Sequence, residues 1–341
     1  MLNNKIMNRL GLSKLHLDKA KLNPSITVFD TSIGSLNVGD QIINQSASKY
    51  LNELFDGHQF IVLPTHSGLK SVGINRANIG DKRFVCGSNI LNSDLLFHQQ
   101  WNFSPWDFFR LEPLILLGVG WSNYQSSPTA YTKLVYNKRL DNKIIHSVRD
   151  NYTLNKLKEI GIRNVINTGC PTMWGLNKEH CSSIPLIKSK DVVFTLTDYR
   201  PDLENDSLMI NILKSYYKNV YFWVQGNQDL SYFQSMDASV KDSINIIPPS
   251  LSSYEKLLKQ VDSLDFIGTR LHAGIKALQN KKRTVIIGVD NRAIEKQKDF
   301  NLKVILRKNI KTELESVIDS SFKTEISINH KEIDEWMGQF K

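Results

Sequence analysis

Cysteine is scarce in this sequence, and long uncharged hydrophobic runs are missing altogether. The three cysteines among 341 residues, Cys86, Cys170 and Cys181, give no even framework and no CxxC pair. This excludes a disulfide scaffold and disfavours a zinc site. No stretch reaches the roughly 18 apolar residues of a membrane-spanning helix, and the N-terminus lacks the apolar core and cleavage site of a secretory signal. We therefore expect a reduced, cytoplasmic protein without a metal or other cofactor.

Signatures of nucleic-acid binding are also missing, although the chain is basic. The sequence has no zinc finger, no RNA-recognition aromatic pattern and no long basic block. Lysine and arginine number 43 against 34 aspartate and glutamate residues, which gives a formal net charge of +9. This excess favours a phosphorylated metabolite or a lipid phosphate headgroup as partner over a nucleic acid, and the alternative is that the charge serves solubility alone.

Short apolar runs rich in β-branched residues alternate with helical patterns, which predicts an α/β protein. The predicted strands cover residues 26–29, 60–63, 83–86, 114–117, 144–148, 164–167, 191–195, 219–224, 244–247, 264–267, 284–287 and 303–306. Strands that alternate with helices form parallel sheets with right-handed crossovers. So many strands in 341 residues suit two doubly wound, Rossmann-like domains better than one.

The expected domain boundary lies in the stretch 174–190, which contains glycine, proline and serine but no apolar period. We expect an N-terminal α/β domain over residues 1–180, a C-terminal α/β domain over residues 181–320 and a helical tail over residues 321–341. The tail can fold over either domain. Within the second domain, Ser252 with Glu255 predicts a capping box that begins a helix.

Ligands of doubly wound sheets bind outside the carboxyl ends of the strands, where loops meet helix N-termini. Polar segments that directly follow a predicted strand are therefore candidate binding sites. Four such segments stand out, at residues 30–40, 147–150, 268–274 and 288–292.

Two of these segments also have ordinary structural interpretations. In the first, Gly39 permits a close backbone approach and Asp40 begins a helix whose N–H groups point at any ligand; the alternative is a plain turn capped by Asp40. In the last, Asp290 either caps a helix or positions a substrate hydroxyl, and capping is the favoured interpretation.

The other two segments carry arginine. Arg149 leaves a strand where Asp150 caps the next helix, and its guanidinium suits a phosphate or a carboxylate; the alternative is an interdomain ion pair. Arg270 and His272 lie two residues apart at a helix start, which makes an anion site with an attached proton donor. The alternative there is a structural arginine and a core histidine.

A resemblance to the polysaccharide pyruvyl transferase family is strongest over residues 265–292, which read DFIGTRLHAGIKALQNKKRTVIIGVDNR. They are similar to that family's strand, its RLHA helix start and the following strand that ends in an aspartate. Three further stretches match in the same order: Asn37-Val38-Gly39-Asp40, Ser147–Asp150 and Thr168-Gly169-Cys170-Pro171. The resemblance runs over residues 26–320.

The sequence departs from the family pattern in three places. The segment 118–121 is poorer in glycine than usual, residues 225–229 replace a His-Pro stretch, and Arg292 stands where the family often has lysine.

The resemblance implies a fold like that of GT-B glycosyltransferases, with two doubly wound domains facing across a cleft. It implies an enzyme of exopolysaccharide biosynthesis, a ketal pyruvyltransferase. Such enzymes move the enolpyruvyl group of phosphoenolpyruvate onto two hydroxyls of a sugar, on a surface polysaccharide or its precursor, and release phosphate. It further implies that Arg270 and His272 hold phosphoenolpyruvate, that Arg149 is the other arginine of that site, and that the Asn37–Asp40 loop lies on the acceptor-side domain.

Protonation of the alkene carbon begins this chemistry, and His272 is the candidate general acid. A helix N-terminus lowers the pKa of a histidine and the charges of bound phosphoenolpyruvate raise it, so we expect His272 to be acidic only in the complex. The scheme requires no metal, and Asp40 is a candidate to assist one sugar hydroxyl. The predicted catalytic residues are His272 and Arg270, and the predicted substrate-binding residues are Arg149, Asn37, Gly39, Asp40 and Asp290.

The expected acceptor is a sugar, an oligosaccharide or a lipid-linked glycan. Trp101, Phe103, Trp106 and Phe108 suit stacking on a sugar or entry into a membrane interface, and the alternative is that they cover the sheet. The basic charge leaves open a peripheral contact with the inner face of the membrane. Two other functions compete: a GT-B glycosyltransferase that uses a nucleotide sugar, and a non-catalytic protein of polysaccharide assembly.

Overall fold

The computed structural model describes residues 24–97, residue 101 and residues 109–341, and these fall into two compact units. The first unit comprises Met1–Ser35, Ile43–Pro171 and Asn329–Lys341, and the second comprises Leu36–Ile42 and Thr172–Ile328. The division therefore falls nearer the N-terminus than the boundary expected after residue 180. The physical reason is that Met173, Leu176 and Cys181 are buried in the hydrophobic core of the second unit.

The first unit contains a doubly wound parallel sheet. Its strands are β1 (Ser25–Asp30), β2 (Gln59–Pro64), β3 (Lys82–Cys86), β4 (Ile115–Leu117), β5 (His146–Val148) and β6 (Val165–Asn167). Four of them pair in the order β2-β1-β3-β4, and β5 pairs with β6. Two contacts connect the four-stranded set to the β5–β6 pair. The N–H of Gly118 donates to the carbonyl of Ser147 at 3.0 Å, and an isolated bridge pairs Val119 with Val148.

Helices of the first unit are α2 (Gly39–Leu54), α3 (Lys70–Ala77), α5 (Ala130–Arg139), α6 (Asn151–Glu159) and α15 (His330–Gly338). The first residues of α2 belong to the Leu36–Ile42 segment of the second unit. Asp150 caps α6 as predicted, because its carboxylate accepts the N–H of Thr153 at 2.8 Å.

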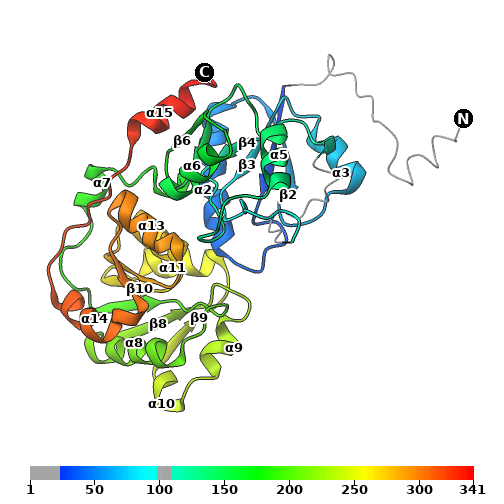
Figure 1. Cartoon of the computed structure of the whole chain (residues 1–341). Helices are drawn as coiled ribbons and strands as arrows, with labels where there is room; N and C mark the ends of the chain where they lie inside the picture. The colour runs from blue at the N-terminus through cyan, green and yellow to red at the C-terminus, as the bar shows by residue number, and fades with distance from the viewer. Residues whose placement is uncertain (1–23, 98–100, 102–108) are drawn as a thin grey trace, which may run out of the picture. The chain divides into compact units, whose positions relative to one another are not determined.

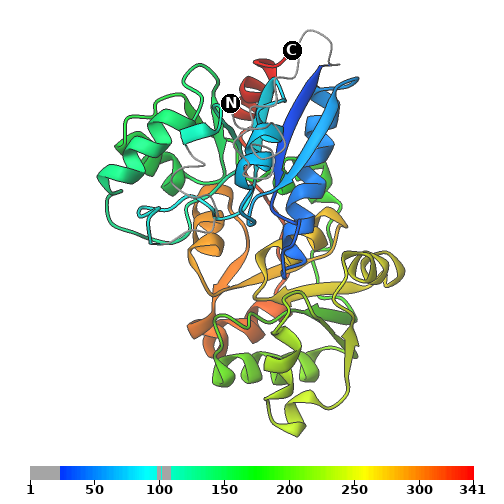
Figure 2. The same ribbon diagram turned by 90° about the vertical axis from the view of Figure 1, so that its right-hand side faces the viewer.

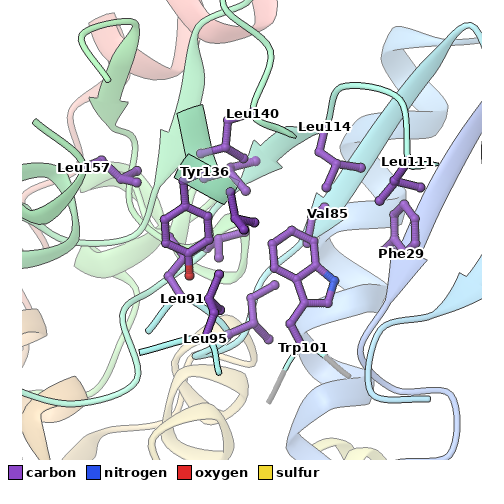
Figure 3. Packing of buried hydrophobic residues seen from close by; sticks show 14 of the residues in the cluster. Phe29, Val85, Leu91, Leu95, Trp101, Leu111, Leu114, Tyr136, Leu140 and Leu157 are labelled. Carbon is purple, nitrogen blue, oxygen red and sulfur yellow. The ribbon is translucent and has the colours of Figure 1, made fainter. Parts of the chain in front are cut away.

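A cluster of buried hydrophobic side chains forms the core of the first unit (Figure 3). Trp101 belongs to this cluster beside Val85 and Leu95 and is 1% exposed. The expectation that Trp101 stacks on a sugar or enters a membrane interface is therefore wrong, since its ring is packed into the core. The other aromatic residues of that stretch, Phe103, Trp106 and Phe108, lie outside the described residues.

The C-terminal helix α15 packs on the first unit. The ring of Trp336 lies 6.1 Å from that of Phe84, and Phe340 contacts both. The side chain of Gln339 accepts from the backbone N–H of Ile145 and donates to its carbonyl. Both views show this helix, in red, beside the strands of the first unit (Figures 1 and 2). The predicted C-terminal tail therefore packs on the first unit and not on the second.

The second unit contains a doubly wound sheet of six parallel strands. They are β7 (Asp191–Phe194), β8 (Asn219–Trp223), β9 (Ile244–Ile247), β10 (Leu264–Gly268), β11 (Thr284–Gly288) and β12 (Val304–Leu306). Their order is β12-β11-β10-β7-β8-β9. All twelve predicted strands are thus confirmed, as are the two doubly wound units.

Helices cover both faces of this second sheet. The helices of the second unit are α7 (Lys178–Ser182), α8 (Leu203–Tyr216), α9 (Asp229–Gln234), α10 (Ala238–Lys241), α11 (Leu251–Gln260), α12 (Leu271–Gln279), α13 (Asn291–Phe300), η3 (Arg307–Asn309) and α14 (Ile310–Asp319). The short helix η2 (Pro171–Met173) begins at the last residue of the first unit's segment Ile43–Pro171. Successive strand residues point to opposite faces: Phe266 joins the cluster of α11, α12 and α13, whereas Ile267 joins that of α8 and α14. Figure 1 shows α11 and α13 on one side of the strands and α8 and α14 on the other.

Helix α11 begins earlier than predicted. Ser250, not Ser252, is its N-cap, and its hydroxyl accepts the N–H of Ser253 at 3.1 Å. The predicted capping box of Ser252 and Glu255 is wrong because Ser252 already lies in the first turn.

Candidate active site of the second unit

The strand order of the second unit places its topological switch point at the carboxyl ends of the paired strands β7 and β10. The chain runs outward from β7 through β8 and β9, and then returns to the other side of β7 with β10. Ligands of doubly wound folds bind at such a switch point. Here the two strand ends are tied together, since the hydroxyls of Thr197 and Thr269 hydrogen-bond at 2.8 Å and the N–H of Arg270 donates to the Thr195 hydroxyl at 3.1 Å.

Arg270 lies at this switch point and is 4% exposed. Its guanidinium donates to the carboxylate of Asp198 at 2.8 Å and to that of Asp229 through Nη2 and Nε. Nε also donates to the carbonyl of Leu196 at 2.8 Å. Nη1 makes no hydrogen bond to any described residue. Two carboxylates therefore fix the guanidinium and leave one of its nitrogens for another acceptor.

Tyr199 lies beside Arg270 and is 51% exposed. The guanidinium carbon of Arg270 lies 5.1 Å from the ring centroid, and that of Arg292 lies 6.0 Å from it. Arg292 also donates to the phenol oxygen of Tyr199. The exposed ring therefore connects the ends of β7, β10 and β11 by cation–π contacts.

Asp290 caps α13, which confirms the favoured interpretation. Its carboxylate accepts the N–H of Arg292 at 3.0 Å and the Nε of the same residue at 2.9 Å. Both carboxylate oxygens are thereby bound to Arg292. A contact of Asp290 with a substrate hydroxyl stays a prediction.

His272 is the second residue of α12 and is 8% exposed. The helix begins directly after Arg270, so the positive end of its dipole lies at the switch point. Gly274 lets the helix lie close on the sheet, because a Cβ there would overlap Ile286 and come within 2.9 Å of Phe266. His272 is therefore held at the strand ends by a helix packed tightly against β10 and β11.

The loop with Asn37, Gly39 and Asp40 is placed differently from the expectation. It belongs to the second unit, which also carries Arg270 and His272. Asn37 accepts the N–H of Gly39 at 3.1 Å, and Asp40 is 8% exposed in the first turn of α2. The expectation of a position on the N-terminal, acceptor-side domain came from the family resemblance.

Arg149 lies in the first unit, at the end of β5, and is 4% exposed. Its Nε donates to Asp150 at 2.9 Å, and this ion pair lies within the first unit. Gly120 makes room for it, because a Cβ at that position would overlap the guanidinium. Gly120 and Trp121, which belong to the segment that departs from the family pattern, therefore contact a predicted site residue.

Sequence reasoning missed Asp198, Tyr199 and Asp229. Asp198 and Tyr199 lie in the loop after β7, whose last residue is Phe194, so a search of the whole loop after this strand would have found them. Asp229 was noticed only as part of the unusual segment 225–229. Its importance becomes visible in the structure, where it is fully buried against Arg270.

Comparison with known proteins decides the family. The family model for polysaccharide pyruvyl transferase matches residues 37–291, from the Asn37 loop through the start of α13. The chain belongs to the polysaccharide pyruvyl transferase family. A search of curated proteins gives no match. As a member of this family, the protein is a transferase that acts on polysaccharide.

Similar solved structures include two UDP-GlcNAc 2-epimerases. A UDP-GlcNAc 2-epimerase of Methanocaldococcus jannaschii, in complex with UDP-GlcNAc and UDP, is 10% identical with a TM-score of 0.52, over 89% of this chain and 95% of that chain. The UDP-GlcNAc 2-epimerase of Neisseria meningitidis is 13% identical with a TM-score of 0.46, over 93% and 100% of the two chains. The first likeness agrees with two Rossmann-like units.

None of the described helices has the length and apolar character that a membrane span requires. Among the residues that the structure describes, no cluster of three or more His, Cys, Asp or Glu side chains is arranged to hold a metal ion.

Proposed function

We propose that this transferase is a ketal pyruvyltransferase that uses phosphoenolpyruvate as donor and a sugar of a surface polysaccharide or its precursor as acceptor. The observation that carries the proposal is the RLHA segment of the family match. It places a buried, oriented guanidinium with an unpartnered Nη1 and a histidine at one helix N-terminus. Helix N-termini and arginine forks are the groups that bind phosphate and carboxylate.

Phosphoenolpyruvate carries two to three negative charges, so its binding needs more positive charge than Arg270 alone supplies. Asp198 and Asp229 offset the charge of Arg270, and Asp290 offsets that of Arg292. We propose that the Nη1 of Arg270 and the start of α12 take one anionic group of the donor; substrate binding by Arg149 stays a prediction.

The proposed reaction balances without an oxidant or a metal. The methylene carbon of phosphoenolpyruvate gains a proton, and its central carbon forms two bonds to sugar oxygens. The bond from that carbon to the phosphate oxygen breaks, and phosphate leaves. Of the two hydroxyl protons, one replaces the proton given to the methylene carbon and the other leaves with phosphate or solvent. We propose His272 as the general acid, with Asp40 assisting one hydroxyl.

A nucleotide sugar is the competing donor. The epimerase from Methanocaldococcus jannaschii, which shares the fold, was solved with UDP-GlcNAc and UDP, and a diphosphate also suits a helix N-terminus. This makes UDP- and GDP-sugars the comparison ligands in any binding test.

The test is binding of phosphoenolpyruvate, UDP-sugars and GDP-sugars, measured by thermal shift and calorimetry. A ligand of the native state raises its stability by mass action. We expect phosphoenolpyruvate to stabilise the wild type. We expect the Arg270→Lys variant to lose most of this effect, since lysine keeps the charge between the aspartates but lacks the guanidinium fork.

The matched control is Lys259→Ala, which removes an exposed cation of α11 and should leave binding unchanged. Stabilisation by a nucleotide sugar and not by phosphoenolpyruvate would contradict the proposal and favour a glycosyltransferase.

A further inference from the structure

The segment Leu36–Ile42 is attached to the loop that follows β8. The chain before and after this segment belongs to the first unit, whereas the segment itself belongs to the second. Two backbone hydrogen bonds make the attachment, one of 3.1 Å from the Val38 N–H to the Gln225 carbonyl and one of 3.1 Å from the Asn227 N–H to the Leu36 carbonyl. Together they form an antiparallel bridge between Asn37 and Gly226.

Side chains reinforce this attachment. The Nε2 of Gln225 donates to the Oδ1 of Asn37 at 2.7 Å, and the same oxygen accepts the N–H of Gly39 at 3.1 Å. Gln225 is 3% exposed, so its amide depends on this partner. A larger residue at position 39 would push the Gln225 amide aside, because a Cβ there would lie 2.7 Å from its Nε2.

The same loop holds Arg270 on its other side. The N–H of Gly226 donates to the carboxylate of Asp229 at 2.7 Å, and this carboxylate pairs with the guanidinium of Arg270. A Cβ on Gly226 would overlap the Nη2 of Arg270. Gly226 therefore contacts both groups: its backbone pairs with Asn37, and its N–H orients the aspartate that orients Arg270.

We infer that Asn37 is a positioning residue for Arg270, acting through Gln225, Gly226 and Asp229. The inference rests on the proposed function in taking phosphoenolpyruvate as the ligand of Arg270. It assigns the Asn37–Asp40 motif to donor binding rather than to the acceptor. It also gives the unusual segment 225–229 a role, which is to join the motif to the guanidinium.

The experiment compares Asn37→Leu with Asn37→Asp. Leucine removes the accepting oxygen and leaves the buried amide of Gln225 without its partner, so we expect the Kd for phosphoenolpyruvate to rise about tenfold. Aspartate keeps an accepting oxygen and suits the N-terminus of α2, so we expect affinity near that of the wild type. Leu36→Ala is the matched control, because that side chain is 71% exposed and its carbonyl bond is retained.

Hydrogen exchange supplies a readout that does not need the donor. We expect the backbone amides of residues 225–229 to exchange faster in Asn37→Leu and at the wild-type rate in Asn37→Asp and Leu36→Ala. Unchanged affinity and unchanged exchange in Asn37→Leu would overturn the inference. Equal losses in the leucine and aspartate variants would also overturn it.

Failure of the proposed function looks different from failure of this inference. If the wild type does not bind phosphoenolpyruvate, the donor assignment fails and hydrogen exchange alone decides the inference. Faster exchange confined to Asn37→Leu then supports the coupling, and unchanged exchange overturns it.

Discussion

Arg270 shows at the scale of single residues what sequence reasoning can and cannot find. Its place after a strand and before a helix made it a candidate, and the structure places it at the switch point. Its partners could not be predicted, because Asp198 and Asp229 lie 72 and 41 residues away in the sequence. Only the order of the strands brings those two loops to one guanidinium.

His146 gives a prediction about pH at the same scale. It is fully buried in β5, where its Nδ1 accepts the N–H of Leu116 at 3.2 Å, so the neutral form with a proton on Nε2 is held beside the carbonyl of Asp141. Burial lowers the pKa of His146 from 6.5 to about 4, although the Asp141 carbonyl and charge raise it. The unfolded chain therefore binds more protons between these values, and the stability that the neutral ring contributes is lost as pH falls from about 6.5 to about 4.

We expect the wild type to lose about 3 kcal/mol more than His146→Gln when pH falls from 7 to 4. Urea unfolding at several pH values measures this difference. Asp206, whose pKa burial raises to about 6, has the opposite sign of pH dependence, but it is present in both proteins and cancels. An identical pH dependence in the two proteins would show that His146 does not titrate in this way.

At the scale of elements, the sequence predicted which helices and strands exist better than the residues at which they begin and end. Buried strands were recognisable because their apolar runs are β-branched and flanked by turn residues. Helix α11 was found but its start was misplaced, since Ser250 and Ser252 are equally good caps in the sequence and only the backbone conformation selects Ser250.

Helix α12 carries the prediction at this scale. Its contact with the sheet requires Gly274, where a Cβ would overlap Ile286. We expect Gly274→Ala to lower the free energy of unfolding by about 1–3 kcal/mol through overpacking, despite the better helix propensity of alanine. Gly338→Ala in α15 is the control, because no atom lies within 4 Å of a Cβ there. Chemical denaturation checks both, and equal effects in the two variants would contradict the close packing of α12.

At the scale of the whole molecule, two doubly wound units were predicted and are confirmed. Which unit the Leu36–Ile42 segment and the C-terminal helix belong to was not predicted. The Leu36–Ile42 segment joins the second unit through hydrogen bonds to residues near position 225, and α15 joins the first through Trp336. Such pairings between distant parts of the chain leave no local pattern in the sequence. The role of the Asn37–Asp40 motif depended on this membership.

The central claim is that phosphoenolpyruvate is the donor, and transfer of its carbon skeleton tests this most directly. Phosphoenolpyruvate labelled with ¹³C at its central carbon would be incubated with the enzyme and an extract of glycans and lipid-linked sugars. We predict that the label appears in a sugar-bound ketal carbon, with one phosphate released for each ketal, and that His272→Gln abolishes both. Transfer of a sugar from a nucleotide sugar to the same extract, with phosphoenolpyruvate left intact, would contradict the account.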